Sequence, residues 1–357
     1  MKKFSIIASI ALTVSLLAGC AGTPVVYYSE CSCSTGSHED ASDETAPAVS
    51  EGAVKTGLYI STNIGDSTSA ADGGQGEVKY DVTIVAVTVD EAGVIQSCQI
   101  DSIPASVTFD ASGSITSDVT AQVLTKNELG EDYGMKKYAG AQYEWNEQAA
   151  ALARYAEGKT VEQLRSGAVN ESGKAADADL ASTATINLGG FVSAIEQAVA
   201  NAQHLGAQAG DELRLAVISG LDGSTGADGS NPGAAQLSAD VVALTLSGET
   251  ITSCAIDSLQ AEVSFDATGT ITTDLSAQVL TKNELGEEYG MKQYAGSAYE
   301  WNEQAAAFAA YVTGKTADEV AGIAVNEKTA PTDADLASTV TISIGGFQAL
   351  IEKAVRG

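Results

Sequence analysis

The chain has 357 residues, with 18 Lys or Arg against 47 Asp or Glu and a net charge of −29 at neutral pH. Such a surface repels the phosphates of nucleic acids and anionic headgroups, so nucleic acid is excluded as a partner. The histidines, His38 and His204, both lie outside the repeated segments described below. A catalytic triad or a metal site that needs a histidine is therefore excluded from those segments.

The first residues predict an export signal. Lys2 and Lys3 precede an apolar run, and Leu-Ala-Gly comes directly before Cys20. These are the parts of a secretory signal, and Cys after Leu-Ala-Gly is typical of a bacterial lipobox. We expect residues 1–19 to be removed, which takes the net charge from −29 to −31, and Cys20 to carry a lipid that anchors the protein to the cell membrane outside the cytoplasm. An ordinary secretory signal with a chance cysteine is the alternative.

Residues 20–54 are poor in large apolar side chains and rich in Ser, Ala, Glu and Asp. Such a composition buries too little surface to offset the entropy lost on ordering, so we expect a flexible tether. Cys31 and Cys33 lie in this segment and suit either a bridge to another chain or a metal site, but no second ligand pair accompanies them.

A long repeat organises the rest of the chain. Residues 125–160 return almost unchanged at 281–316, an offset of 156 positions. A repeat of this length is a duplicated domain rather than a solenoid unit. The predicted first copy, linker and second copy are residues 55–200, 201–210 and 211–357.

The first half of each copy predicts an antiparallel sheet. In the first copy we expect a strand near residues 57–64, followed by an acidic loop at 66–76. The loop lacks the Asp spacing and the terminal Glu of a calcium loop, so it is interpreted as solvated. Residues 82–103 and 107–116 are rich in β-branched side chains around turn signals, which is typical of hairpins.

The second half of each copy predicts helices. Trp145 and Leu152 fall at helical spacing on one apolar face, and Gly158 ends that helix. A capping box at Thr160 starts a short helix, and a last helix is expected near residues 190–202. The same signals recur in the second copy. The sequence therefore predicts an α+β fold made of two tandem copies of an antiparallel-sheet domain with C-terminal helices.

A Tyr-Gly-Met turn before the Trp helix is the first candidate ligand site. The glycine lets the backbone approach a ligand closely, and Tyr, Met and Trp around it suit a flat aromatic ring. A buried turn with aromatic core residues is the alternative. The residues of this turn are Tyr133, Gly134 and Met135 in the first copy and Tyr289, Gly290 and Met291 in the second.

A Ser/Thr cluster that follows an Asp and precedes the last helix is the second candidate site. Backbone N–H groups at a helix start can hold a phosphate, whereas an Asp there can cap the helix instead. Both interpretations stay open. The candidate residues are Asp177, Ser182, Thr183 and Thr185 in the first copy and Asp333, Ser338, Thr339 and Thr341 in the second.

The order of these elements resembles the FMN-binding domain family. The resemblance rests on a V-x-V-D-x-x-G-x-I strand pair, the glycine turn before the Trp helix, and Asp-Ala-x-x-x-x-Thr-x-Thr before the last helix. That family includes flavin-carrying subunits of membrane redox complexes and tandem-domain surface lipoproteins. The resemblance implies that Thr183 and Thr339 lie at the phosphate of FMN. It also implies an electron carrier with a redox partner in the membrane.

The family's Ser-Gly-Ala is Leu180-Ala181-Ser182 in this chain, and the second copy carries the same change. Covalent flavin, non-covalent FMN, another flat ligand and a fold without a ligand therefore stay open. A non-redox ligand-binding or structural surface lipoprotein is the alternative function. A hydrolase is disfavoured because no pair of nucleophile and base recurs in both copies, so an electron carrier or a binding protein is expected rather than a catalyst.

Overall fold

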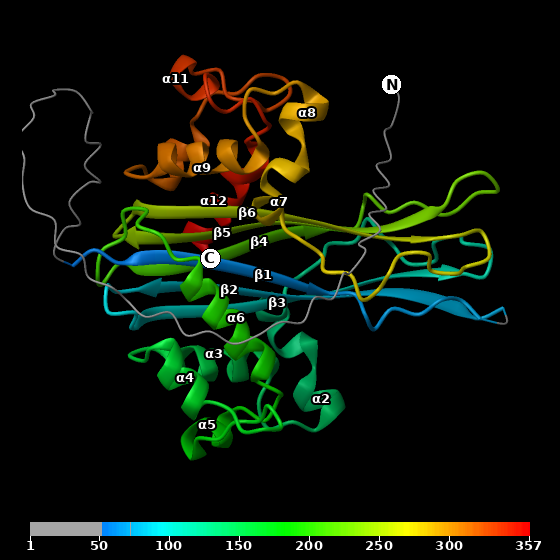
Figure 1. Ribbon diagram of the computed structural model, residues 1–357, viewed down its shortest axis with the longest axis horizontal. Helices are drawn as coiled ribbons and strands as arrows, with labels where there is room; N and C mark the ends of the chain where they lie inside the picture. The colour runs from blue at the N-terminus through cyan, green and yellow to red at the C-terminus, as the bar shows by residue number, and fades with distance from the viewer. Residues whose placement is uncertain (1–51, 72) are drawn as a thin grey trace, which may run out of the picture. The chain divides into compact units, whose positions relative to one another are not determined.

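Two three-stranded antiparallel sheets, one from each copy, form the centre of the computed structural model (Figure 1). The structure describes residues 52–71 and 73–357, so the predicted signal, the predicted lipidation site at Cys20 and most of the predicted tether lie outside the described residues. The strands are β1 (Lys55–Asn63), β2 (Gln75–Val89) and β3 (Ile95–Asp110), then β4 (Glu212–Gly220), β5 (Gly233–Ser247) and β6 (Thr250–Phe265). Helices follow each sheet, which confirms the predicted α+β fold of two tandem copies.

The helices of the first copy are α1 (Lys126–Leu129), η1 (Gly130–Tyr133), α2 (Met135–Ala139), α3 (Trp145–Ala156), α4 (Val161–Gly167), α5 (Ala178–Thr183) and α6 (Gly189–Ala200). Those of the second copy are α7 (Lys282–Leu285), η2 (Gly286–Tyr289), α8 (Met291–Ala295), α9 (Trp301–Val312), α10 (Ala317–Ala321), α11 (Ala334–Ala337) and α12 (Gly345–Arg356). No helix of the described residues is long and apolar enough to cross a bilayer.

The predicted second hairpin is present but shorter than expected. Residues 107–110 continue β3, and after the turn at Gly113 the returning chain pairs with it through a bridge between Phe109 and Ile115 and a hydrogen bond of 2.8 Å from Thr116 N–H to the Thr108 carbonyl. The β2 strand also begins at Gln75, earlier than predicted. The central sheets are therefore longer than the β-branched runs alone indicate.

Each strand pair has two buried faces because side chains alternate along a strand. One face packs on the helices of the same copy, and the other packs on the sheet of the other copy. On β2 the residues Val78, Tyr80, Val82 and Ile84 lie in the core between the sheets, and Val85, Val87 and Val89 lie in the core under the helices. Figure 1 shows the resulting layers, with the two sheets between the helices of the first copy and those of the second.

The core between the sheets belongs to both copies. Phe109 and Phe265 stack with ring centroids 4.1 Å apart at 5°. The Tyr80 hydroxyl donates to the Ala235 carbonyl at 2.8 Å, which joins the sheets again. The sequence analysis expected two tandem domains and missed this third core, which both copies share.

The predicted linker, residues 201–210, lies along the start of β1. The backbones of Thr56 and Gln203 exchange hydrogen bonds of 2.9 and 3.0 Å, and Val54 N–H donates to Ala207 at 3.0 Å. His204 Nε2 lies 2.8 Å from a Glu91 carboxylate oxygen.

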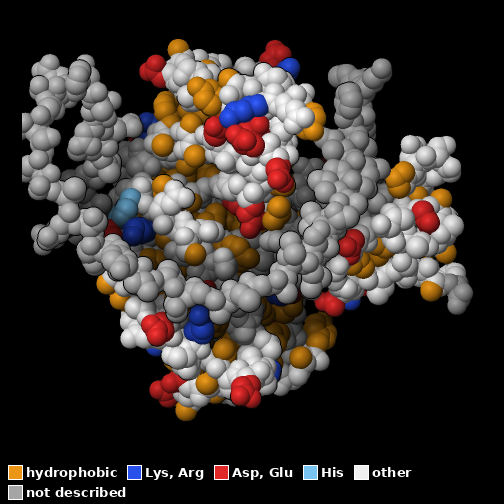
Figure 2. All heavy atoms as spheres, viewed as in Figure 1, with side chains coloured by type: hydrophobic (Ala, Val, Ile, Leu, Met, Phe, Trp, Pro, Cys, Tyr) orange, Lys and Arg blue, Asp and Glu red, His pale blue; other side chains and the backbone are white. Residues whose placement is uncertain are grey.

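Figure 2 shows Asp and Glu side chains over the helices on both sides of the sheets, with Lys and Arg between them.

Candidate functional site

The Tyr-Gly-Met turn is held from inside by a buried carboxylate. Gly134 has φ of 80°, and a Cβ there would lie 2.5 Å from the Tyr138 ring, so the glycine is needed for this local packing. Met135 N–H and Lys136 N–H donate to the buried Glu144 carboxylate at 2.7 and 3.1 Å. Glu300 holds the turn of Tyr289, Gly290 and Met291 in the same way.

A lysine covers the aromatic side chains beside this turn. Lys126 Nζ lies 5.1 Å from the Trp145 ring and 5.3 Å from the Tyr133 ring, which are cation–π distances. Trp145 and Trp301 are 4% and 5% exposed, which confirms that both rings belong to the core. The space expected for a flat ligand is therefore taken by an ammonium group of the chain itself, and Lys282 repeats the arrangement in the second copy.

The Asp of the Ser/Thr cluster caps a short helix. Asp177 Oδ1 accepts from Asp179 N–H and Leu180 N–H at 2.9 and 3.0 Å. The hydroxyls of Ser182 and Thr183 donate to the Asp179 carbonyl at 2.6 and 3.3 Å. In the second copy Asp333 caps α11, Ser338 donates to Asp335 and Thr339 donates to Leu336.

One buried glutamine brings the two predicted segments together. Gln148 Oε1 accepts from Thr185 N–H at 2.7 Å, Thr185 Oγ1 at 3.2 Å and Ile186 N–H at 3.1 Å. Its Nε2 donates to the Tyr143 carbonyl at 3.0 Å and lies 3.8 Å from Met135 Sδ. Gln304 makes the same bonds to Thr341. Sequence reasoning missed this role, although a glutamine inside an otherwise apolar helix face in both copies was its signal.

These contacts test whether the predicted residues fit FMN. A phosphate needs unpaired N–H or O–H donors, and the donors at this junction already serve Asp177 and Gln148. The Thr183 hydroxyl is likewise engaged with the Asp179 carbonyl. In this arrangement the residues do not form a phosphate cradle, and flavin binding stays a prediction.

A buried aspartate of each copy faces the space between the sheets. Burial raises the pKa of Asp101 and of Asp257 to about 6. Asp257 Oδ1 accepts from Ser258 N–H at 2.7 Å and Asn283 N–H at 3.1 Å, which limits the shift. An acid within a β-branched strand in both copies was the overlooked sequence signal.

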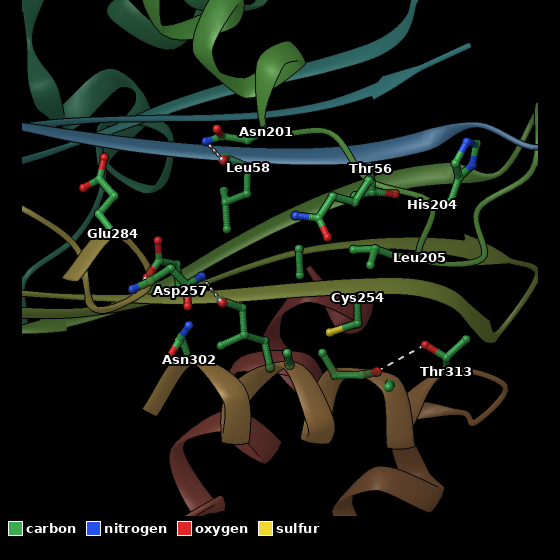
Figure 3. Close-up of a pocket in the computed structure, with 17 residues that line it drawn as sticks. Thr56, Leu58, Asn201, His204, Leu205, Cys254, Asp257, Glu284, Asn302 and Thr313 are labelled. Atoms are coloured by element: carbon green, nitrogen blue, oxygen red, sulfur yellow. Dashed lines mark hydrogen bonds between the residues drawn. The ribbon is translucent and has the colours of Figure 1, made fainter. Parts of the chain in front are cut away.

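A cleft of about 610 Å³ lies beside Asp257, where β1 meets β6, α7 and α9 (Figure 3). Leu58 and Leu205 line it from the first copy and the linker. The residues that line it from the second copy include Asp257, Glu284, Asn302, Ala306 and Ala310. The cleft is thus built from both copies and combines an apolar wall with carboxylate and amide groups.

The fold has a second place of the same kind, because the two sheets meet along two seams. We call the meeting of β1 with β6, α7 and α9 the open seam. We call the meeting of β4 with β3, α1 and α3 the closed seam. Gln99 of β3 donates to the Leu213 carbonyl of β4 at 2.6 Å, and Lys353 of α12 pairs with Glu128 and donates to the Val217 carbonyl at 2.5 Å.

The two side chains that cross the closed seam have no equivalents in the open one, which is crossed instead by a 2.7 Å hydrogen bond between the Thr56 and Ser253 hydroxyls. At the repeat offset of 156, Gln99 corresponds to Ala255 and Lys353 to Gln197. Ala255 lines the cleft. Differences between the copies, rather than the repeat itself, therefore mark this site, and sequence reasoning did not use them.

Comparison with protein-family models, with curated proteins and with solved structures found no match for this chain. The function of this chain is therefore inferred from the geometry of its cleft.

Proposed function

We propose that the protein is a non-redox ligand-binding lipoprotein of the cell envelope, with its ligand in the cleft of the open seam. One observation carries the proposal: where Gln99 and Lys353 cross the closed seam to the other copy, the equivalent open seam has a cleft of about 610 Å³. Binding sites for small molecules typically have volumes of roughly 300–1,000 Å³ and often lie between domains.

The lining of the cleft suits a small amphipathic molecule. Leu58, Leu205 and Ala306 offer apolar surface, and Asp257 and Glu284 offer negative charge. An apolar body is favoured by the release of water from this surface, and the few polar groups fix its orientation.

The experiment is a fragment screen by ligand-observed NMR on the wild-type chain and on Ala255→Gln. This substitution installs the side chain that crosses the closed seam at Gln99. Fragments bound in the cleft should lose their signal in the variant. A set of bound fragments that is the same for both proteins would contradict the proposal.

The anchor is a separate proposal that the sequence around Lys2, Lys3 and Cys20 supports. Cys20→Ala should leave the exported protein without lipid and move it from the membrane to the soluble fraction. A variant that stays membrane-bound would contradict lipid anchoring at this residue.

A flavin electron carrier remains the alternative that the resemblance implies. A visible spectrum of exported wild-type protein tests it, because FMN carries its own colour. A flavin spectrum, lost in Thr183→Val with Thr339→Val, would place the electron carrier ahead of the binding protein.

A further inference from the structure

We propose that the ligand of the open seam carries a primary alkylammonium group, which pairs with Glu284 while its alkyl chain lies along the apolar wall of the cleft. This inference rests on the proposed function and names the chemical class of the ligand.

The closed seam contains such a group from the chain itself. The Lys353 ammonium pairs with Glu128 and donates to the Val217 carbonyl at 2.5 Å. The closed seam is thus filled by an ammonium group on an aliphatic side chain of the protein itself. Glu128 corresponds to Glu284 at the repeat offset, so the open seam retains the acceptor.

The open seam lacks the corresponding cation. The counterpart of Lys353 is the exposed and uncharged Gln197, and Glu284 forms no ion pair with any described residue. Glu284 accepts Thr281 N–H at 2.8 Å as part of a capping box, so its carboxylate is held at the cleft rather than free to leave it.

The carbonyl acceptor of the closed seam also has a counterpart. The turn between β2 and β3 is one residue longer than the turn between β5 and β6, so residues before these turns correspond at an offset of 157. Val217 therefore corresponds to Ile60. Asn201 Nδ2 donates to the Leu58 carbonyl at 3.0 Å across the outer edge of β1. Because hydrogen-bonding groups alternate along an antiparallel strand, the Ile60 carbonyl points to the same edge.

Other acceptors line the cleft itself. Asp257 adds a second carboxylate. Asn302 Oδ1 is buried without a hydrogen-bond partner among the described residues, although Asn146 Oδ1 shares this state and does not distinguish the seams. The two carboxylates, Glu284 and Asp257, favour a cation and disfavour an anion such as a phosphate.

The test is isothermal titration of the full chain with cadaverine, a diamine whose alkyl chain resembles that of lysine. Pentanol is the control because it has the same alkyl length without the charge. We expect cadaverine to bind and pentanol to bind at least about tenfold more weakly, since a lost charge-assisted contact changes affinity on that scale.

Two variants probe the acceptor and the internal competitor. Glu284→Gln keeps the capping box but removes the charge, and should lower the affinity for cadaverine by about fivefold or more. Gln197→Lys places a lysine in the open seam at the position that corresponds to Lys353. Its ammonium group should compete for Glu284 and lower the affinity for cadaverine by about tenfold. Glu128→Gln is the matched control in the closed seam and should leave binding unchanged.

A lysine-containing tripeptide with blocked ends is the second arm. Tighter binding of the peptide than of cadaverine would assign a peptide lysine as the source of the ammonium group, and the reverse would assign a free amine. Equal binding of cadaverine and pentanol, or of cadaverine to wild type and Glu284→Gln, would overturn the inference. If Ala255→Gln still abolishes binding of neutral fragments, the cleft survives as a site and only the ligand class fails.

Discussion

The two seams start from the same repeated sequence and reach opposite states. In the closed seam, Gln99 donates to Leu213 of the other copy and Lys353 pairs with Glu128 of the other copy. In the open seam their counterparts are Ala255 and Gln197, and a cleft lies in that place. The comparison shows that two copies of one sequence can leave a cleft at one seam and fill the equivalent place at the other with side chains of the protein itself.

The shared core should give the largest effect, because both seams rest on it. Phe265→Ala removes a fully buried ring that stacks on Phe109, and should lower the free energy of unfolding by about 4–5 kcal/mol. Urea unfolding followed by circular dichroism should show one transition for both copies. Two separate transitions would show that the seams are not parts of one cooperative unit.

The two cores under the helices should lose equal stability when equivalent residues are changed, whereas the two seams differ. Trp145→Ala and Trp301→Ala each delete a buried ring that packs edge-on against a phenylalanine, and each should cost about 3–5 kcal/mol. The measurement is urea unfolding of each variant. A loss below about 1 kcal/mol in either would contradict equivalent packing of the two copies.

One buried aspartate lies at each seam, and the two should make the stability of the ligand-free protein depend on pH. Burial raises the pKa of Asp101 and Asp257 to about 6, so the folded protein keeps these protons at a pH where the unfolded chain has lost them. The free energy of unfolding should therefore fall as the pH rises from about 4 to about 6.

Asp101→Asn and Asp257→Asn should each remove part of this fall, on the order of 1–3 kcal/mol. An asparagine still accepts the backbone hydrogen bonds through its amide oxygen. Thermal or urea unfolding across this pH window measures the change. A slope that persists unchanged in the double variant would show that other groups cause it.

The closed seam should open at small cost. The side chains of Lys353 and Glu128 are 34% and 28% exposed, so Gln99→Ala with Lys353→Gln should lose about 0–1 kcal/mol from the ion pair. The double variant should gain a second cadaverine site, which titration would show as a doubled stoichiometry. An unchanged stoichiometry would mean that these two side chains do not close the seam.

Local signals explain what the sequence could predict. The capping box at Thr160 and the helical spacing of Trp145 and Leu152 depend on neighbours in the chain, and the structure confirms both. The shared core depends on partners far away. The alternation of Val78, Tyr80 and Val82 predicts a buried face, but it does not say that the other copy covers it.

The candidate site was harder to predict than the fold. Gln148 joins the two predicted segments, but its partners lie 37 and 38 residues away. The cleft arises where Ala255 replaces the longer Gln99, so the informative position carries a residue without chemistry of its own. The candidate residues that recur in both copies have largely structural roles.

The most direct test uses the two seams as reporters in one sample. Two-dimensional NMR of backbone amides follows Ala255, Asp257 and Asn283 in the open seam, and Gln99, Asp101 and Asn127 in the closed seam, during titration with cadaverine and with fragments from the screen. The account predicts saturable shifts in the first set and none in the second. Equal shifts in both sets, or none in either, would contradict the claim that the open seam is the binding site.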